Sequence, residues 1–152
     1  MAIELERVTT PAGMKRALAI RRTVFIEGQN VPESIEIDGY DDFPSVTEGV
    51  AHGLLRLDGE PVATGRFVPD GEAGHFAKVG RVAVLEHVRG RGLGRVMMRW
   101  LEQEAAQLGY DGVRLSAQLH ALGFYETLGY VGYGEIFMEA DIEHRWMELS
   151  FS

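Results

Sequence analysis

The most constraining feature of the sequence is a valine-rich segment followed by a glycine-rich turn and a long amphipathic pattern. Residues 78–85 (KVGRVAVL) are typical of a buried strand. From Gly92 to Leu108 apolar side chains recur at helical spacing, and Gly109 follows as a helix stop. A strand, a short turn and a helix in this order predict that the helix packs against a sheet.

The rest of the chain extends this unit into a single domain over residues 1–152. An Asp-Gly pair at residues 58–59 separates two alternating segments, which predicts a β-hairpin. Prolines and glycine interrupt residues 27–48, which predicts a long loop of the kind that often binds ligands. We expect strands at residues 3–8, 50–57, 61–68, 78–85, 111–117, 130–138 and 145–151, and helices at residues 11–26, 92–108 and 120–128. This order predicts a mixed α+β fold with one twisted, mixed sheet covered by helices.

The amino-acid composition excludes several kinds of catalytic and metal-binding site. The chain contains no cysteine, which excludes disulfides, thiolate catalysis, zinc–thiolate sites and iron–sulfur clusters. Its first ten residues are charged from position 4 and lack the apolar core of a signal peptide. No apolar run approaches the roughly 20 residues that cross a membrane. We therefore expect a cytoplasmic protein with no membrane partner.

Charge is unevenly distributed along this chain, whose formal net charge is −8. Residues 80–99 hold five arginines and one glutamate, whereas residues 23–55 hold seven acids and no lysine or arginine. An acidic chain with one basic segment is a poor nucleic-acid binder but can hold one small polyanion. The acidic segment would attract a cationic partner. The alternative is that both segments are solvated faces.

The basic segment contains a candidate anion site. Three glycines at alternate positions, Gly90, Gly92 and Gly94, stand between the predicted strand and helix. Such a turn lets a ligand approach main-chain N–H groups, and the helix N-terminus adds free donors and a positive dipole end. The same turn carries Arg89, Arg91 and Arg95. A purely structural turn with solvated arginines is the alternative.

Two common phosphate-binding patterns do not fit this turn. The G-x-x-x-x-G-K-[ST] pattern is absent, and a G-x-G-x-x-G pattern that begins at Gly90 would need glycine where Arg95 stands. Instead, Arg89-x-x-Gly92-x-Gly94 resembles the [QR]-x-x-G-x-[GA] pyrophosphate signature of the GNAT superfamily of acyl-CoA-dependent N-acetyltransferases.

Further segments carry the same resemblance. GFYETLGY at residues 123–130 is similar to the family's F-Y-x-x-x-G-[FY] element. RRTVFIEGQNVPESIEIDGYDD and GEIFMEADIEHRWM resemble the R-x-x-V-F-x-x-E-Q-x-V-P-x-x-x-E-x-D and G-x-x-F-x-E-x-x-I-x-H-x-x-M patterns of a small bacterial subgroup. The matched segments stand in the family's order over residues 21–147. The resemblance implies one twisted six- to seven-stranded sheet flanked by about four helices, with acetyl-CoA as cosubstrate and no metal.

The resemblance also implies site residues. The pyrophosphate would lie on the main chain of Arg89, Gly90, Arg91, Gly92, Leu93, Gly94 and Arg95. Pantetheine would pair with Val82, Ala83 and Val84, where a backbone N–H would polarise the thioester carbonyl. Tyr125 matches the family's usual general acid, which protonates the departing thiolate, although a tyrosine that only fills space is the alternative.

His144 aligns with a histidine that resembles the base of amino-acid-acetylating relatives, and imidazole suits the deprotonation of an amine. A structural histidine, with Glu143 or a water as base, is the alternative. Predicted acceptor contacts are Glu27, Glu36, Asp38, Arg81 and Gln118. Gly28 stands where the subgroup has a glutamate, and Gln118 stands where related enzymes have an arginine. The other histidines have no metal-ligand spacing and are interpreted as non-catalytic: His52, His75, His87 and His120.

The favoured hypothesis is an N-acetyltransferase in which an amine of a small molecule or peptide attacks the thioester directly. One alternative is a catalytically silent acyl-CoA-binding sensor or interaction module on the same fold. Another is a nucleotide-binding protein that uses the glycine turn for ATP. A homodimer through the terminal strands is plausible for this fold by analogy.

Overall fold

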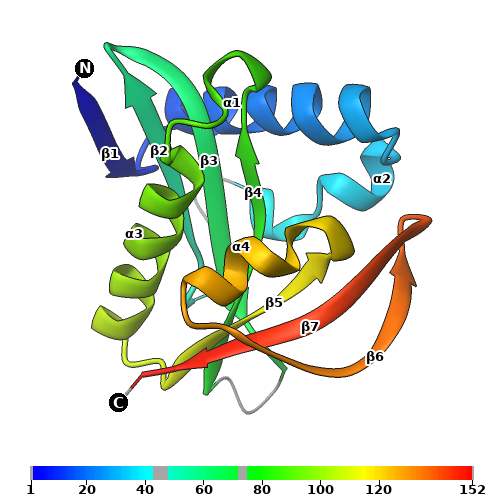
Figure 1. Cartoon of the computed structure of the whole chain (residues 1–152). Helices are drawn as coiled ribbons and strands as arrows, with labels where there is room; N and C mark the ends of the chain where they lie inside the picture. Colours follow the sequence, from blue (N-terminus) through cyan, green and yellow to red (C-terminus); the bar gives the residue numbers. More distant parts are fainter. Residues whose placement is uncertain (1, 43–47, 72–74, 152) are drawn as a thin grey trace.

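Seven strands form a single mixed sheet in the part of the chain that the structure describes. The structure is a computed structural model that describes residues 2–42, 48–71 and 75–151. The strand order is β1-β2-β3-β4-β5-β7-β6, and β4 with β5 is the parallel pair (Figure 1). The strands are β1 (Ile3–Arg7), β2 (Ala51–Leu57), β3 (Glu60–Pro69), β4 (Phe76–Val84), β5 (Gly112–Gln118), β6 (Val131–Glu139) and β7 (Ile142–Ser150).

Helices cover both faces of this sheet. The α-helices are α1 (Pro11–Arg21), α2 (Glu33–Glu36), α3 (Leu93–Gln107) and α4 (Leu122–Thr127). A π-helical turn, η1 (Arg22–Glu27), extends α1, and short 3-10 turns form η2 (Gly39–Asp41), η3 (Glu86–Val88) and η4 (Leu119–Ala121). The predicted mixed α+β fold with a twisted sheet and four helices is therefore confirmed.

Strand alternation explains how α1 and α3 come to lie on opposite faces. Leu54 packs in a cluster with Ala17 of α1, whereas the next residue, Leu55, belongs to the larger core that contains Met97 of α3. Successive side chains of a strand point to opposite faces of the sheet. All four side chains are buried, so both helices are fixed by apolar packing against β2, β3 and β4.

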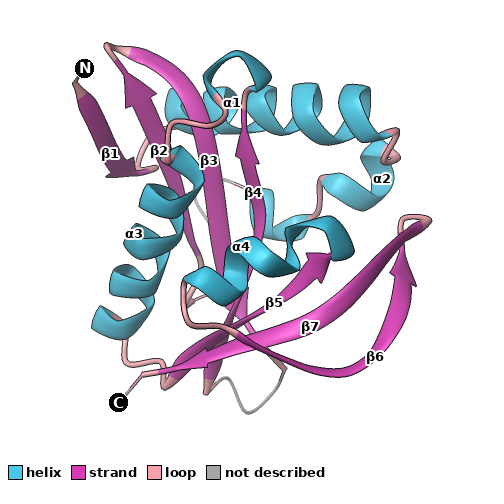
Figure 2. Ribbon diagram, viewed as in Figure 1, coloured by secondary structure: helices cyan, strands magenta, loops and turns pink. Residues whose placement is uncertain are grey.

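The parallel strands β4 and β5 stay together over only half of their length. Residues Phe76–Val79 of β4 pair with Gly112–Leu115 of β5, and the two strands then separate (Figure 2). A β-bulge shifts the β3–β4 register between Thr64 and Arg66, and Arg81 adopts a φ of 55° at this bulge. Beyond the bulge β4 continues beside β3, while β5 continues beside β7. We call the resulting gap between the ends of β4 and β5 the opening.

The predicted helix at residues 11–26 formed and is helical as far as Glu27, although its pairing changes from α to π at Arg22. Two other predicted boundaries were wrong in detail. The predicted loop at residues 27–48 contains α2 and η2, and its residues 43–47 lie outside the described residues. The last strand begins at Ile142, earlier than predicted, because Ala140 and Asp141 make the preceding turn with positive φ although neither is glycine.

In the described part of the chain, every helix is too short or too polar to cross a lipid bilayer.

Candidate functional site

The glycine turn after η3 presents the N-terminus of α3. Gly90 and Gly92 have φ values of 82° and 78°, in the left-handed region that favours glycine. Gly92 is the N-cap residue and supplies no side-chain cap, so the first N–H groups of α3 are not capped by it. A Cβ on either glycine would meet nothing within 4 Å. The turn thus exposes helix donors to any anion that lies over it.

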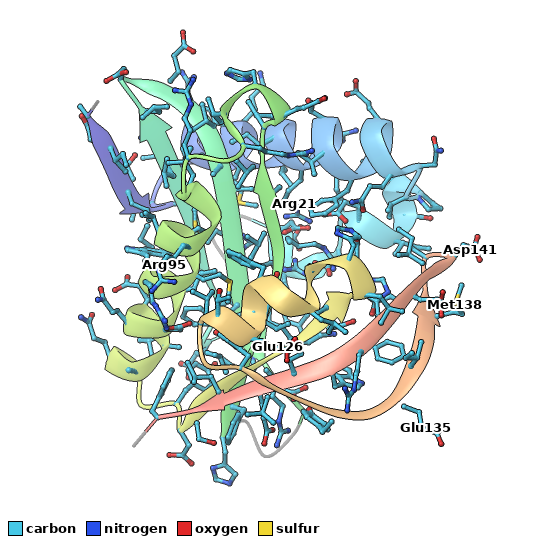
Figure 3. The ribbon with its side chains drawn as sticks, viewed as in Figure 1. Arg21, Arg95, Glu126, Glu135, Met138 and Asp141 are labelled. Carbon is cyan, nitrogen blue, oxygen red and sulfur yellow. The ribbon has the colours of Figure 1, made fainter. Side chains whose placement is uncertain are left out.

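Arginine side chains surround this turn. Arg89 donates from Nε to the carbonyl of Val84 at 2.9 Å and so attaches the turn to the end of β4. Arg91 and Arg95 are exposed, and Arg95 projects from the first turn of α3 (Figure 3). Gly94 faces α4, because its Cβ would lie 3.5 Å from the ring of Phe124. The predicted phosphate-binding residues therefore lie together at one end of α3.

The end of β4 offers main-chain groups to the opening. The amide of Leu85 donates to Val62 of β3 at 2.9 Å, and Ala63 lies opposite Val84. Since an antiparallel ladder uses alternate residues, the main-chain groups of Val84 point away from β3. On that side β5 has already separated from β4. The carbonyl of Val84 accepts from Arg89, and the rest of this side of β4, from Val82 to Val84, is where an extended ligand could lie.

Tyr125 lies in α4 with its ring packed against other aromatic rings. It meets Phe124 edge-on at 5.1 Å and Tyr130 at 5.8 Å between ring centroids. Burial raises the pKa of Tyr125 to about 12. Its phenol therefore carries a proton at neutral pH and can act as a hydrogen-bond donor.

His144 is 5% exposed and lies inside β7. Its Nδ1 is 2.7 Å from the carbonyl of Ile142, and because a carbonyl only accepts, Nδ1 carries the proton of the neutral ring. Nε2 lies 3.5 Å from Oε2 of Glu139, and the ring stacks on Phe137 with an interplanar angle of 26°. These contacts leave Nε2 as the nitrogen that can accept a proton.

Gln118, at the end of β5, lies opposite His144 in the β5–β7 ladder. Its Nε2 donates to Oε1 of Gln29 at 2.9 Å, and its Oε1 lies 2.6 Å from Nε2 of His120. Sequence reasoning missed Gln29, because it lies 89 residues from Gln118 in the chain. It interpreted His120 as non-catalytic, because this histidine has no metal-ligand spacing. The glutamine of the E-Q-x-V-P pattern was the available signal for Gln29.

A buried ionic network holds the segment with α2 and η2 against the sheet. Arg21 is 1% exposed and projects from the end of α1 into the region between α1, α2 and β4 (Figure 3). It lies 2.9 Å from Oε2 of Glu36 and donates to both oxygens of Asp41 at 2.6 and 2.9 Å. Burial raises the pKa of Glu36, although the arginines Arg81 and Arg21 oppose this shift. For Asp41, burial acts in the same direction, but hydrogen bonds from Arg21 and the backbone of Asp38 outweigh it and lower the pKa to about 2.

Arg66 and Arg81 complete the network. Arg66 donates to both carboxylate oxygens of Asp38 at 2.7 Å. Burial would raise the pKa of Asp38, but the hydrogen bonds and charge of Arg66 outweigh it and lower this pKa. Arg81 donates to the carbonyls of Glu36 and Ile35, both at 3.1 Å. Glu36, Asp38 and Arg81 were predicted to contact the acceptor, and in this structure their charges are directed toward one another.

The remaining predicted acceptor residue, Glu27, ends η1 and is exposed. The next residue, Gly28, is also exposed, and a Cβ there would lie 3.2 Å from the carbonyl oxygen of Thr23, which is a tight contact. Within the described residues, no group of three or more histidine, aspartate or glutamate side chains is arranged to hold a metal ion.

The chain is similar to known proteins in both sequence and fold. The model of the Acetyltransferase (GNAT) family matches residues 15–130. The chain is 37% identical over 150 residues to the Bacillus subtilis protein described as uncharacterized protein YyaT. This alignment covers 99% of this chain and 97% of that protein. The crystal structure of Escherichia coli ElaA has a TM-score of 0.84 and 28% identity, covering 97% of this chain and 99% of that one. The crystal structure of an acyl-CoA N-acyltransferase from Pseudomonas aeruginosa has a TM-score of 0.83 and 29% identity, with the same coverage.

Proposed function

Because the chain belongs to the acetyltransferase (GNAT) family, we propose that it transfers an acetyl group from acetyl-CoA to the amine of a small molecule or a peptide. One observation carries this proposal. The glycine turn that begins α3 is attached by Arg89 to the stretch of β4 that has parted from β5. A helix N-terminus that suits an anion and the side of β4 that β5 has left therefore lie next to each other, which fits a pyrophosphate joined to an extended amide chain.

The cosubstrate is proposed to lie along these two features. Its pyrophosphate accepts from N–H groups between Arg89 and Arg95, where exposed guanidinium groups add positive charge. Its pantetheine arm runs beside Val82–Val84, and an N–H group there polarises the thioester carbonyl. The amine attacks that carbonyl directly, so no covalent enzyme intermediate forms, in agreement with a chain that has no cysteine.

Two side chains are proposed to move protons. Tyr125 gives a proton to the departing sulfur, since its phenol carries a proton at neutral pH and its place in α4 matches the family element. His144 accepts a proton at Nε2 through a water, since the ring itself is buried. The nearby carboxylate of Glu139 would stabilise the imidazolium that results.

The acceptor is proposed to be cationic and to enter beside the segment with α2 and η2. The carboxylate of Glu36 is buried and balanced by arginines, so it acts through the position of that segment. Asp38 is partly exposed but is paired with Arg66 and Arg81, whereas Glu27 is exposed and is the predicted acceptor carboxylate that can attract an ammonium group from solution. Gln118 contributes a neutral polar contact from β5.

A panel of amines tests the proposal. Release of free CoA thiol is followed with acetyl-CoA and each amine, and acetyl-CoA affinity is measured separately by calorimetry. We expect amine-dependent thiol release with at least one cationic acceptor. Binding of acetyl-CoA without release for any amine would instead support a silent sensor and refute the enzyme. Displacement of acetyl-CoA by ATP would support the nucleotide-binding alternative.

A further inference from the structure

A chain of three hydrogen-bonded side chains crosses the acceptor side of the opening. Gln29, just after η1, and Gln118, at the end of β5, form an amide pair with donor–acceptor distances of 2.9 and 3.5 Å. His120 in η4 adds a third member, with its Nε2 2.6 Å from Oε1 of Gln118. The chain links segments 89 residues apart in the sequence and ends on an exposed imidazole.

This hydrogen bonding selects the tautomer of His120. Because Nε2 of Gln118 donates to Gln29, the atom that faces His120 is the carbonyl oxygen Oε1. An amide oxygen only accepts, so the neutral ring of His120 carries its proton on Nε2 and its lone pair on Nδ1. The lone pair on Nδ1 is then available to accept a proton, as a general base must.

The position of His120 suits the reaction centre. Beyond Leu115, β5 forms the side of the opening that faces the end of β4, and Gln118 is its last residue. His120 follows in η4, the turn that leads directly into α4, where Tyr125 lies. The turn that carries His120 therefore connects the strand beside the opening to the helix of the proposed acid, and the contact with Gln118 holds the ring at the end of β5.

We infer that His120 is a second catalytic base, which takes the first proton from the acceptor ammonium at Nδ1. The inference rests on the proposed function. The amine, now neutral, attacks the thioester carbon and forms the N–C bond. The C–S bond breaks with its electron pair on sulfur, which receives the proton of Tyr125. The second proton of the nitrogen passes to Nε2 of His144.

The protons balance in this scheme. Nitrogen loses two protons, one to each histidine, and sulfur gains one from Tyr125. His144 returns its proton to the tyrosinate, and His120 releases the other to solvent. An exposed ring suits that release, whereas His144, at 5% exposure, suits the internal return. The net products are the amide, the CoA thiol and one free proton.

Other titratable groups lie on the elements packed around η4. These elements are β7, α4 and the segment that carries Gln29. Their charged or titratable residues are Glu27, Tyr125, Glu126, Glu143, His144, Arg145 and Glu148. Since His144 is also the ladder partner of Gln118, the experiment must separate the two histidines.

The first test replaces His120 with asparagine in the full chain and uses the best amine from the panel. We expect kcat to fall by about 10²–10⁴-fold while acetyl-CoA affinity, circular dichroism and the thermal midpoint stay unchanged. The low-pH slope of log kcat against pH should fall from two toward one, because only one base then remains. His75→Asn, at an exposed histidine outside the site, is the matched control and should retain wild-type kcat.

The second test is Gln118→Glu, which sets a carboxylate against Nε2 of His120. A carboxylate favours the protonated ring, so the acidic limb of kcat should move to higher pH, by about one unit or more. In the His120→Asn background the same change should leave the limb in place. A limb that still moves there, or a His120→Asn enzyme with wild-type kcat and slope, would overturn the inference. A wild-type protein that acetylates no amine would overturn the proposed function as well.

Discussion

Replacing Arg21 with methionine should destabilise the fold by an amount that the structure allows us to estimate. Arg21 is 1% exposed and makes four hydrogen bonds to Glu36 and Asp41. Loss of one partner of a buried ion pair costs about 3–5 kcal/mol, because a charge remains without compensation. Here Arg66 still contacts Asp41 at 3.0 Å, and Arg81 still lies 3.2 Å from Glu36. We therefore expect the lower end, about 3 kcal/mol.

Urea unfolding monitored by tryptophan fluorescence and circular dichroism measures this free energy by linear extrapolation. Arg22→Met is the matched control, because Arg22 is the next residue and its ion pair with Glu33 is largely exposed. That variant should lose at most about 1 kcal/mol. If Arg21→Met lost no more free energy of unfolding than Arg22→Met, the buried network would not stabilise the fold more than an exposed ion pair does.

Three further predictions follow from the site. Gly92→Asp should abolish the binding of acetyl-CoA measured by calorimetry. The control Gly109→Asp adds the same negative charge at another glycine with positive φ, beyond the other end of α3, and should bind acetyl-CoA normally. An equal loss of affinity in both variants would refute the placement of the phosphate. Tyr125→Phe and His144→Ala should each lower kcat by about 10²–10⁴-fold in the thiol-release assay with acetyl-CoA affinity almost unchanged, and a wild-type rate in either would return that residue to a packing role. Because the pKa of Asp41 is lowered from 3.8 to about 2, its contribution to stability is complete above about pH 4 and is lost as the pH falls through 2. The difference in free energy of unfolding between wild type and Asp41→Asn, about 2 kcal/mol at higher pH, should therefore close at low pH. A difference that does not change with pH would contradict the assignment.

Local sequence patterns predicted the elements but not the contacts among them. The helical repeat that begins at Gly92 and the Asp-Gly turn at residues 58–59 act over a few residues, and both elements formed as expected. The turn at residues 140–141 has positive φ without glycine, so nothing in its composition indicated where β7 begins. Short helices such as α2 depend on tertiary packing rather than on a repeating pattern.

The contacts that sequence reasoning missed join residues that are far apart in the chain. Glu36 was proposed as an acceptor contact from its place in a family pattern, but its partner Arg21 lies 15 residues away on another helix. The amide pair of Gln29 and Gln118 spans 89 residues. Periodicity and spacing report neighbours along one element, and neither can identify a partner that only the folded sheet brings into contact.

The bulge at Arg81 joins the two halves of the site. A non-glycine residue with a φ of 55° costs about 1–2 kcal/mol, and Arg81 adopts this conformation at the point where β4 and β5 have separated. The same residue donates to the carbonyls of Ile35 and Glu36, so the strained position is held by the segment beside which the acceptor is proposed to enter. The backbone of Arg81 thus lies where β4 leaves β5, while its side chain holds the segment with α2. One residue therefore links the strand along which the cosubstrate is proposed to lie to the segment beside which the acceptor is proposed to enter.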